Sequence, residues 1–408
     1  MKRYLLPVLL SLVMLGCQNM HKSHKESAKQ RWNSARSGFR YDLADRQFKA
    51  GELSKALASA QNIIDGDPQF IPAYILMGRI YLEQNRLGPA QKSFDTSLKL
   101  DPCCVEAHYS LGILREKRGS LDQALESYQK ARRLQSKHAP YLLAVAETLV
   151  ALDRQKEALE LLQGYIHAED QIEPDASVYL AAGNILLNMN KPDEAVEMFR
   201  QCAYLQPDDP FVTESLAYAL FEADKSLESV ELFEQLQQKT EQEGKQFSWA
   251  NYLALGDGYM KLGRYYKAQR CYETVAEHDN SNPEIWIRLG QAALARNDLN
   301  GARHYLDKAM VLKPNDVNAQ LALAYLALKT SEYARAEEIL RQIITADNNN
   351  SLAYCLLGQT LQARSQMSQA RDCYDQALKI DPQDSLARKL ILDLQKEQPT
   401  PPEKQKKL

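Results

Sequence analysis

The sequence predicts an all-α fold in which pairs of helices stack as a solenoid. Two series of small residues recur along the chain at a spacing of 34 in nearly every interval, and the second follows the first by twelve residues. The first series is Ala44, Gly78, Gly112, Ala146, Gly183, Ala217, Gly256, Gly290, Ala324 and Gly358. The second is Ala56, Ala90, Ala124, Ala158, Ala195, Ser229, Ala268, Ala302, Ala336 and Ala370. Small residues held in phase indicate two helices per unit that cross closely, and a period of this length is typical of stacked helical hairpins. No stretch alternates apolar and polar residues as a strand would.

Ten repeats follow from this spacing. They run over residues 37–70, 71–104, 105–138, 139–172, 176–209, 210–243, 249–282, 283–316, 317–350 and 351–384. The repeat from 283 carries Trp286, Leu289–Gly290, Ala302, Leu306, Ala309 and Pro314. This resembles the tetratricopeptide pattern of W-x2-L-G-x2-Y followed by Ala, an aromatic residue and Pro. The resemblance implies a right-handed α-solenoid of about ten tetratricopeptide hairpins.

Local signals support helix ends at the expected places. The pairs Asp101–Pro102 and Asp381–Pro382 predict the ends of second helices, because proline lacks an N–H and restricts the residue before it. Gly119 and Gly263 predict left-handed turns between paired helices. After the repeats, residues 385–398 form an amphipathic segment that we expect to cap the last apolar face. Its apolar residues are Leu386, Leu390, Ile391 and Leu394.

Two connections are longer than the rest and separate the repeats into groups. One runs from Asp170 to Asp175, and the other from Gln238 to Phe247. The second is polar, contains a glycine, and divides repeats at 37–243 from repeats at 249–384. We expect it to be a hinge that a protease cuts first. The alternative is that the preceding helix runs one turn longer.

The first sixteen residues read as a signal peptide rather than as part of the fold. A basic start is followed by a short apolar run that ends in Met14-Leu15-Gly16-Cys17. This resembles a bacterial lipobox, in which the cysteine thiol takes a diacylglyceryl group and becomes the mature N-terminus. Met14 and Leu15 depart from the commoner pattern, and a cysteine placed there by chance is the alternative. Gln18, which is not Asp, implies sorting to the outer membrane; the inner membrane is the alternative.

Residues 17–36 read as a lipidated tether. They are basic and polar, which suits either anionic headgroups or a plain solvated linker. Residues 399–408 lack apolar anchors and are expected to be disordered. The net charge of −3 gives no basis for nucleic-acid binding.

Cysteine positions favour buried thiols over a disulfide framework. Besides Cys17 the chain holds Cys103, Cys104, Cys202, Cys271, Cys355 and Cys373, with no C-x-x-C pair. Such residues pack as small apolar side chains, although an even number leaves one pairing open.

Enzymatic, metal and cofactor signatures are missing from the sequence. The seven histidines are scattered, and no H-E-x-x-H, G-x-S-x-G, Walker loop or dinucleotide fingerprint occurs. The repeats use nearly the whole chain. We therefore expect a non-catalytic protein with no cofactor and no small-molecule substrate.

Binding of protein partners is the class of function that these exclusions leave. By resemblance to the family, positions 2, 5, 9, 12 and 13 of each first helix line a concave groove. The candidate groove residues are Tyr41, Arg79, Tyr109, Asn184, Tyr218, Phe221, Asp257, Lys261 and Tyr325. An apolar lining that bears tyrosines suits an extended or helical protein segment. Tyr218 and Phe221 are expected to anchor it, unless they only pad the contact with the next repeat.

Three functions fit these features. The favoured one is a periplasm-facing lipoprotein scaffold that serves assembly of an envelope machine for pili, secretion or exopolysaccharide export. The alternatives are a scaffold or regulator of peptidoglycan hydrolases, or a periplasmic adaptor without the lipid. The groove chemistry is the same in each case, so the sequence leaves them open.

Overall fold

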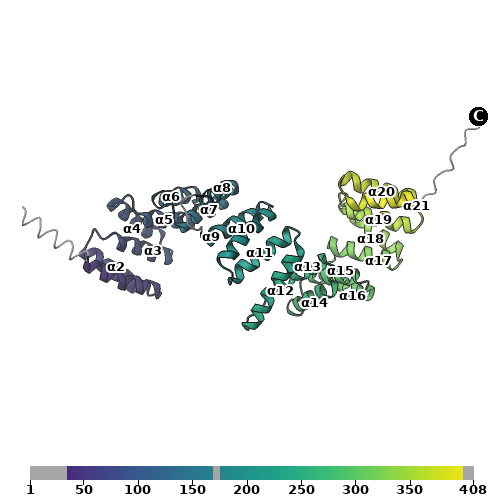
Figure 1. Ribbon diagram of the computed structural model, residues 1–408, viewed down its shortest axis with the longest axis horizontal. Helices are drawn as coiled ribbons and strands as arrows, with labels where there is room; N and C mark the ends of the chain where they lie inside the picture. Colours follow the sequence, from purple (N-terminus) through teal and green to yellow (C-terminus); the bar gives the residue numbers. More distant parts are fainter. Residues whose placement is uncertain (1–34, 169–174, 398–408) are drawn as a thin grey trace, which may run out of the picture. The chain divides into compact units, whose positions relative to one another are not determined.

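The computed structural model describes residues 35–168 and 175–397, and within these ranges the regular structure is entirely helical. The chain divides into two compact units, one ending at Leu205 and the other beginning at Gln206. Each unit is a series of helical hairpins joined by short turns (Figure 1). This confirms the all-α solenoid of repeated hairpins.

The first unit begins with a helix over residues 35–49. The helices that follow are α2 (Leu53–Gly66), α3 (Ile71–Glu83), α4 (Leu87–Leu100), α5 (Val105–Lys117), α6 (Leu121–Leu134), α7 (Ala139–Ala151), α8 (Gln155–Ile166), α9 (Ala176–Asn188) and α10 (Pro192–Leu205).

The second unit contains the remaining five hairpins and one additional helix. Its helices are α11 (Pro210–Glu222), α12 (Ser226–Gln242), α13 (Trp249–Lys261), α14 (Tyr265–His278), α15 (Pro283–Ala295), α16 (Leu299–Leu312), α17 (Val317–Lys329), α18 (Tyr333–Ala346), α19 (Ser351–Ala363), α20 (Met367–Ile380) and α21 (Ser385–Glu397).

The close crossing of paired helices has a specific cause. In the hairpins whose small residue is glycine, a large side chain of the second helix rests on the backbone of the first at that position. A Cβ atom added to Gly78 would lie 2.2 Å from the Phe94 ring, and one added to Gly112 would lie 2.3 Å from the Tyr128 ring. The same contact pairs Gly183 with Phe199, Gly256 with Tyr272, Gly290 with Leu306 and Gly358 with Tyr374. All ten residues of the second small series are fully buried. Both series therefore mark the helix crossing, as predicted.

Each hairpin turns through one residue in the left-handed backbone region. Gly119 and Gly263 have φ of +74° and +69°, which confirms the predicted turns. Asn, Asp or Ser occupies the equivalent position in seven other hairpins. These residues are Asn85, Asp153, Asn190, Asp224, Asn297, Ser331 and Ser365.

The core runs as a series of clusters that neighbouring hairpins share. In the first unit, Ala44, Ile63 and Leu76 belong to one cluster although they come from three successive helices. In the second unit a single cluster extends from Ala217 to Ala319. Stability therefore comes from contacts between adjacent hairpins, as expected for stacked repeats.

Helix α21 covers the last hairpin. Leu394 is buried, and Leu390 and Ile391 pack against the cluster that contains Tyr374. Leu386 was expected to join them but is exposed, and Ala387 is the buried residue of that turn. The hydroxyl of Ser351 and the backbone N–H of Ala387 both donate to the Asp384 carboxylate, which ties the start of α21 to α19.

Residues 238–242 follow the alternative expectation, in which the preceding helix runs one turn longer, and first cleavage by a protease stays a prediction. Helix α12 continues to Gln242 and is 17 residues long. Gln237 donates to Glu241 at 2.9 Å, and the ammonium of Lys239 donates to the carbonyl of Asp208, so polar side chains support the extra turn. The connection is also fixed at its far end, because Phe247 is buried. The other long connection lies mostly outside the described residues.

Candidate binding pockets

The first helices of the first unit form a cavity of about 650 Å³. Its lining from α3 includes Pro72, Ile75, Arg79 and Leu82, which are positions 2, 5, 9 and 12 of that repeat, together with Ile71 at position 1. Helix α5 adds Glu106, Tyr109 and Ile113, which are positions 2, 5 and 9 of the next. The cavity thus joins equivalent positions of adjacent repeats, as the groove hypothesis requires.

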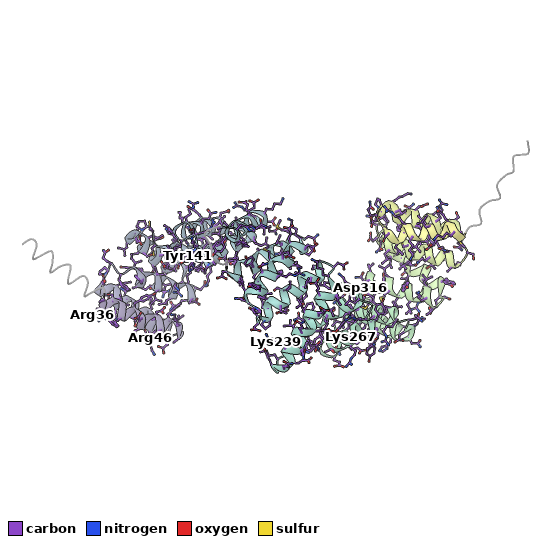
Figure 2. The ribbon with its side chains drawn as sticks, in the orientation of Figure 1. Arg36, Arg46, Tyr141, Lys239, Lys267 and Asp316 are labelled. Atoms are coloured by element: carbon purple, nitrogen blue, oxygen red, sulfur yellow. The ribbon has the colours of Figure 1, made fainter. Side chains whose placement is uncertain are left out.

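Tyrosines dominate the wall of this first-helix pocket. Tyr41 comes from the helix at 35–49, Tyr109 from α5 and Tyr141 from α7. Figure 2 marks Tyr141 among the side chains of the first unit. The Tyr109 and Tyr141 ring centroids lie 5.2 Å apart, and Tyr41 makes an edge contact with Phe70. No described residue hydrogen-bonds to the hydroxyls of these three tyrosines. Burial raises the pKa of each, so all three remain neutral donors and acceptors at physiological pH.

Charges of opposite sign lie along the same helices. The Arg79 guanidinium is exposed and sits 5.0 Å from the centre of the Phe48 ring. Further along, Glu116 accepts a hydrogen bond of 2.8 Å from the Tyr128 hydroxyl. Desolvation and the nearby Glu116 carboxylate raise the pKa of Glu147 on α7. A ligand would therefore meet a cation beside Tyr41 and carboxylates beyond Tyr109.

The groove residues predicted in the second unit are held by neighbouring repeats. The Tyr218 hydroxyl donates to Asn251 Oδ1 at 3.0 Å, and its ring makes an edge contact with Phe233. Lys261 Nζ lies 4.2 Å from the centre of the Phe221 ring and 3.1 Å from Asp224. These contacts favour the interpretation that Tyr218 and Phe221 pad the contact with the next repeat.

The remaining predicted residues do not gather at one site. Asp257 accepts a 2.6 Å hydrogen bond from Tyr272 and lies 3.4 Å from the Arg288 guanidinium. Tyr325 is half-buried, with Lys329 Nζ 5.3 Å from its ring centre. Asn184 is exposed on α9, outside the lining of the first-helix pocket. Of the nine predicted residues, the first-helix pocket brings together three: Tyr41, Arg79 and Tyr109.

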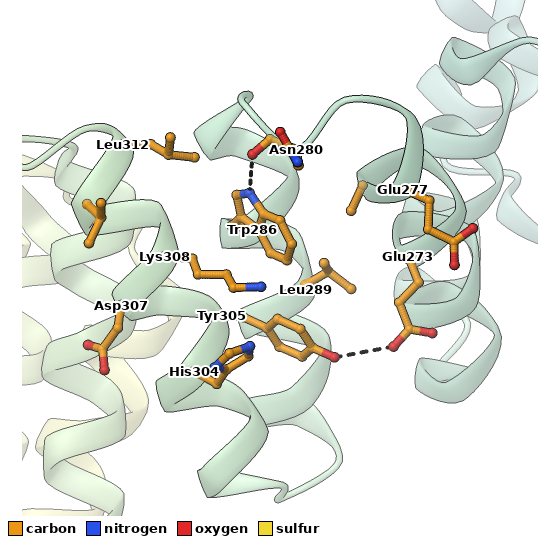
Figure 3. A pocket seen from close by; sticks show the side chains of 12 residues that line it. Glu273, Glu277, Asn280, Trp286, Leu289, His304, Tyr305, Asp307, Lys308 and Leu312 are labelled. Atoms are coloured by element: carbon orange, nitrogen blue, oxygen red, sulfur yellow. Dashed lines mark hydrogen bonds between the residues drawn. The ribbon is translucent and has the colours of Figure 1, made fainter.

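A second cavity was not predicted. It has a volume of about 780 Å³ and lies between the second helices α14 and α16, with α15 as its floor (Figure 3). Trp286 and Leu289 on the floor are buried. The Trp286 indole N–H donates to the carbonyl of Asn280, and Lys308 Nζ lies 4.2 Å from the indole centre. Sequence analysis did not single out this cavity, because a tryptophan at this place in the repeat pattern is read as core. The structure adds the apolar pair Val311 and Leu312, which is exposed at the end of α16.

Comparison with known families and proteins identifies the repeat. Two family models described as tetratricopeptide repeat match residues 75–139 and 110–288. A third, described as the tetratricopeptide domain of cytochrome c-type biogenesis protein H, matches residues 274–388. The chain is a tetratricopeptide repeat protein.

Curated relatives share this repeat at low identity. Tetratricopeptide repeat protein 21A of Mus musculus is 24% identical over 76% of this chain and 24% of its own length. Protein O-mannosyl-transferase TMTC3 of Homo sapiens is 25% identical over 67% of this chain and 29% of its own length. The chain thus spans about a quarter of these relatives. Among solved structures, the Cut9-Hcn1 hetero-tetramer of APC/C is 13% identical, covers 88% of this chain and 96% of its own, and has a TM-score of 0.44.

Membership of the tetratricopeptide family gives the coarse function. Tetratricopeptide repeats bind protein partners and act as interaction scaffolds. In the described part of the chain, no three or more His, Cys, Asp or Glu side chains are placed to hold a metal ion. None of the helices in that same part has the length and apolarity to cross a membrane.

The cysteines of this tetratricopeptide protein mostly serve packing. Cys104, Cys271 and Cys355 are buried, and the Cys202 thiol donates to the carbonyl of Ala176. Burial raises the pKa of Cys271 to about 12, which leaves the thiol protonated and unreactive at physiological pH. Cys103 is exposed, contrary to the expectation of buried thiols. Cys17 lies outside the described residues, and its lipidation stays a prediction.

Proposed function

We propose that this chain is a membrane-anchored, non-catalytic scaffold that holds an apolar segment of a partner protein in the first-helix pocket. The observation that carries the proposal is the meeting of Tyr41, Arg79 and Tyr109 in one cavity. Aromatic side chains there provide area with little loss of rotamer freedom, and such residues dominate binding energy when a partner covers them.

The pocket also defines what the partner segment carries. The free tyrosine hydroxyls suit the backbone N–H and C=O groups of an extended chain. Arg79 suits a carboxylate, and Glu147 suits a basic side chain. An apolar segment with an acidic residue at one end and a basic residue at the other therefore matches this surface and fixes the direction of binding.

Site-specific crosslinking tests the pocket. The photoreactive residue p-benzoylphenylalanine replaces Arg79, which is exposed at the pocket, or Glu160, which is exposed on the second helix α8. In cells, the variant at position 79 should give a discrete crosslinked protein that the variant at 160 does not give. Crosslinks of equal yield to the same protein from both positions would show that the pocket is not the site.

Anchoring through Cys17 is the second part of the proposal. The sequence Met14-Leu15-Gly16-Cys17 supports it, and several acyl chains on one cysteine give stable attachment. We place the protein at the outer membrane facing the periplasm, where a scaffold would serve assembly of an envelope machine. Gln18 is the residue that supports this placement.

Labelling with palmitate tests the anchor. The Cys17→Ala variant should lose the label and accumulate as an uncleaved precursor. The Cys103→Ala variant is the matched control, because Cys103 is an exposed thiol of the folded repeats. Equal labelling of Cys17→Ala and the unaltered chain would remove the lipoprotein proposal.

A further inference from the structure

We propose that the α14–α16 pocket is a second binding site, which takes an apolar partner segment that carries an arginine or lysine. This site is formed by second helices, so it is separate from the first-helix pocket. Its volume of about 780 Å³ accommodates two or three side chains. Three features define the occupant: a cation-binding indole, a surplus of carboxylates and an exposed apolar pair.

The indole of Trp286 already holds a cation. Lys308 Nζ lies 4.2 Å from its ring centre, within the range of a cation–π contact. Lys308 is exposed and its long side chain is flexible, so its ammonium group can move aside. Tyr305 stacks beside the indole with an interplanar angle of 23°, which extends the aromatic surface. An incoming guanidinium would occupy the place that Lys308 now takes.

The carboxylates that line the pocket around the indole outnumber its lysines. Glu273, Glu277 and Asp307 line the pocket, against Lys308 as its one lysine (Figure 3). The Glu273 carboxylate accepts from Gln269 at 2.7 Å and from the Tyr305 hydroxyl at 3.2 Å, so its position is fixed. Glu277 and Asp307 are exposed, and neither forms an ion pair with another described residue. These two carboxylates can therefore pair with a basic side chain from outside.

An exposed apolar pair lies at the end of the same pocket. Val311 and Leu312 close α16, and 81% of Val311 is accessible to solvent. The adjoining Leu289 of the floor and Ala276 of α14 are apolar. An apolar side chain next to the basic residue would cover Val311, which explains why a valine occupies this surface.

Three labelled pentapeptides probe the site on the full-length chain: Leu-Ser-Leu-Arg-Leu, and the same peptide with Gln or Glu in place of Arg. Fluorescence anisotropy gives each affinity. The arginine peptide should bind at least about fivefold more tightly than the glutamine peptide, and the glutamate peptide most weakly. Equal binding of all three would overturn the proposal, because it would show no selection for a cation.

Variants of exposed residues locate the binding without disturbing the core. Glu277→Gln with Asp307→Asn should abolish the preference for arginine. The control pair Glu338→Gln with Asp372→Asn removes the same charge from exposed positions on α18 and α20 and should preserve the preference. Lys308→Ala should tighten binding of the arginine peptide about threefold or more, whereas Lys379→Ala on α20 should not. Loss of the preference in the control pair, or weaker binding to Lys308→Ala, would contradict a site at Trp286.

Discussion

At the residue scale, the size of the small residue in most first helices matches the size of the side chain that packs over it from the second helix. Where the residue is glycine, the covering side chain sixteen residues later is aromatic in five of six hairpins. Where it is alanine, the covering residue is smaller in three of four: Ala44 with Ala60, Ala146 with Leu162, and Ala324 with Leu340. The extra methyl group of alanine thus comes with a smaller partner, because the crossing is already filled. Ala217 with Phe233 departs from this pattern.

Gly78→Ala tests this complementarity. The new methyl group would clash with the Phe94 ring, so the substitution should lower the free energy of unfolding by about 1–3 kcal/mol. Gly164→Ala is the matched control, because this helical glycine faces open space. The substitution there should raise the free energy of unfolding by about 0.5–1 kcal/mol. Chemical denaturation measures both.

Adding Phe94→Leu should relieve the clash, as the natural pair of Ala146 with Leu162 does. The double variant should then be more stable than the sum of the single effects by at least about 0.5 kcal/mol. If Gly78→Ala stabilises the chain as much as Gly164→Ala does, contact with the Phe94 ring is not the reason that position 78 is glycine.

At the element scale, most helix positions could be predicted and the exceptions have physical reasons. The period of 34 places every hairpin, because apolar contacts recur with it. The sequence left the extra turn of α12 open as an alternative to a hinge, because polar side chains make this turn and they leave no apolar pattern. The first-helix pocket was predictable in part, since repeat positions transfer from one hairpin to the next. The α14–α16 pocket was not, because it depends on which side chains of three helices leave space between them.

The capping helix α21 gives a prediction for pH. Hydrogen bonds from Ser351 and from the backbone of Ala387 lower the pKa of Asp384 below its ordinary value of 3.8. The folded protein therefore favours the ionised carboxylate. Its contribution to stability is complete above the ordinary value and is lost as the pH falls through the lowered one.

Asp384→Ala should cost about 1 kcal/mol at neutral pH, a typical loss for a helix cap. This difference from the unaltered chain should shrink as the pH falls below the ordinary value of 3.8 and through the lowered pKa of Asp384. Asp393→Ala, at a half-buried residue of the same helix whose ion pair with Lys396 lies at the surface, should change stability by less than about 0.5 kcal/mol. Thermal unfolding across pH measures these effects. A difference that grows on acidification would mean that the Asp384 carboxylate does not hold α21.

At the scale of the whole molecule, the first-helix pocket and the predicted anchor Tyr218 differ in how their tyrosine hydroxyls are used. In the first unit, Tyr41, Tyr109 and Tyr141 accept or donate no hydrogen bond to another described residue at the pocket. In the second unit, the Tyr218 hydroxyl donates to Asn251. Free hydroxyls suit a ligand, whereas paired hydroxyls fix neighbouring helices. This difference moves the expected partner site from Tyr218 and Phe221 to the first four repeats.

The central claim is that the first-helix pocket binds the partner while Tyr218 only stabilises its own unit. The most direct test measures thermal unfolding and partner affinity on the same samples of Arg79→Glu and Tyr218→Ala, with the crosslinked protein as ligand. Arg79→Glu should unfold within about 0.5 kcal/mol of the unaltered chain but bind about tenfold or more weakly. Tyr218→Ala should lose about 2–4 kcal/mol of stability and, where folded, bind normally. Unchanged affinity in Arg79→Glu together with lost affinity in folded Tyr218→Ala would contradict the claim and place the site in the second unit.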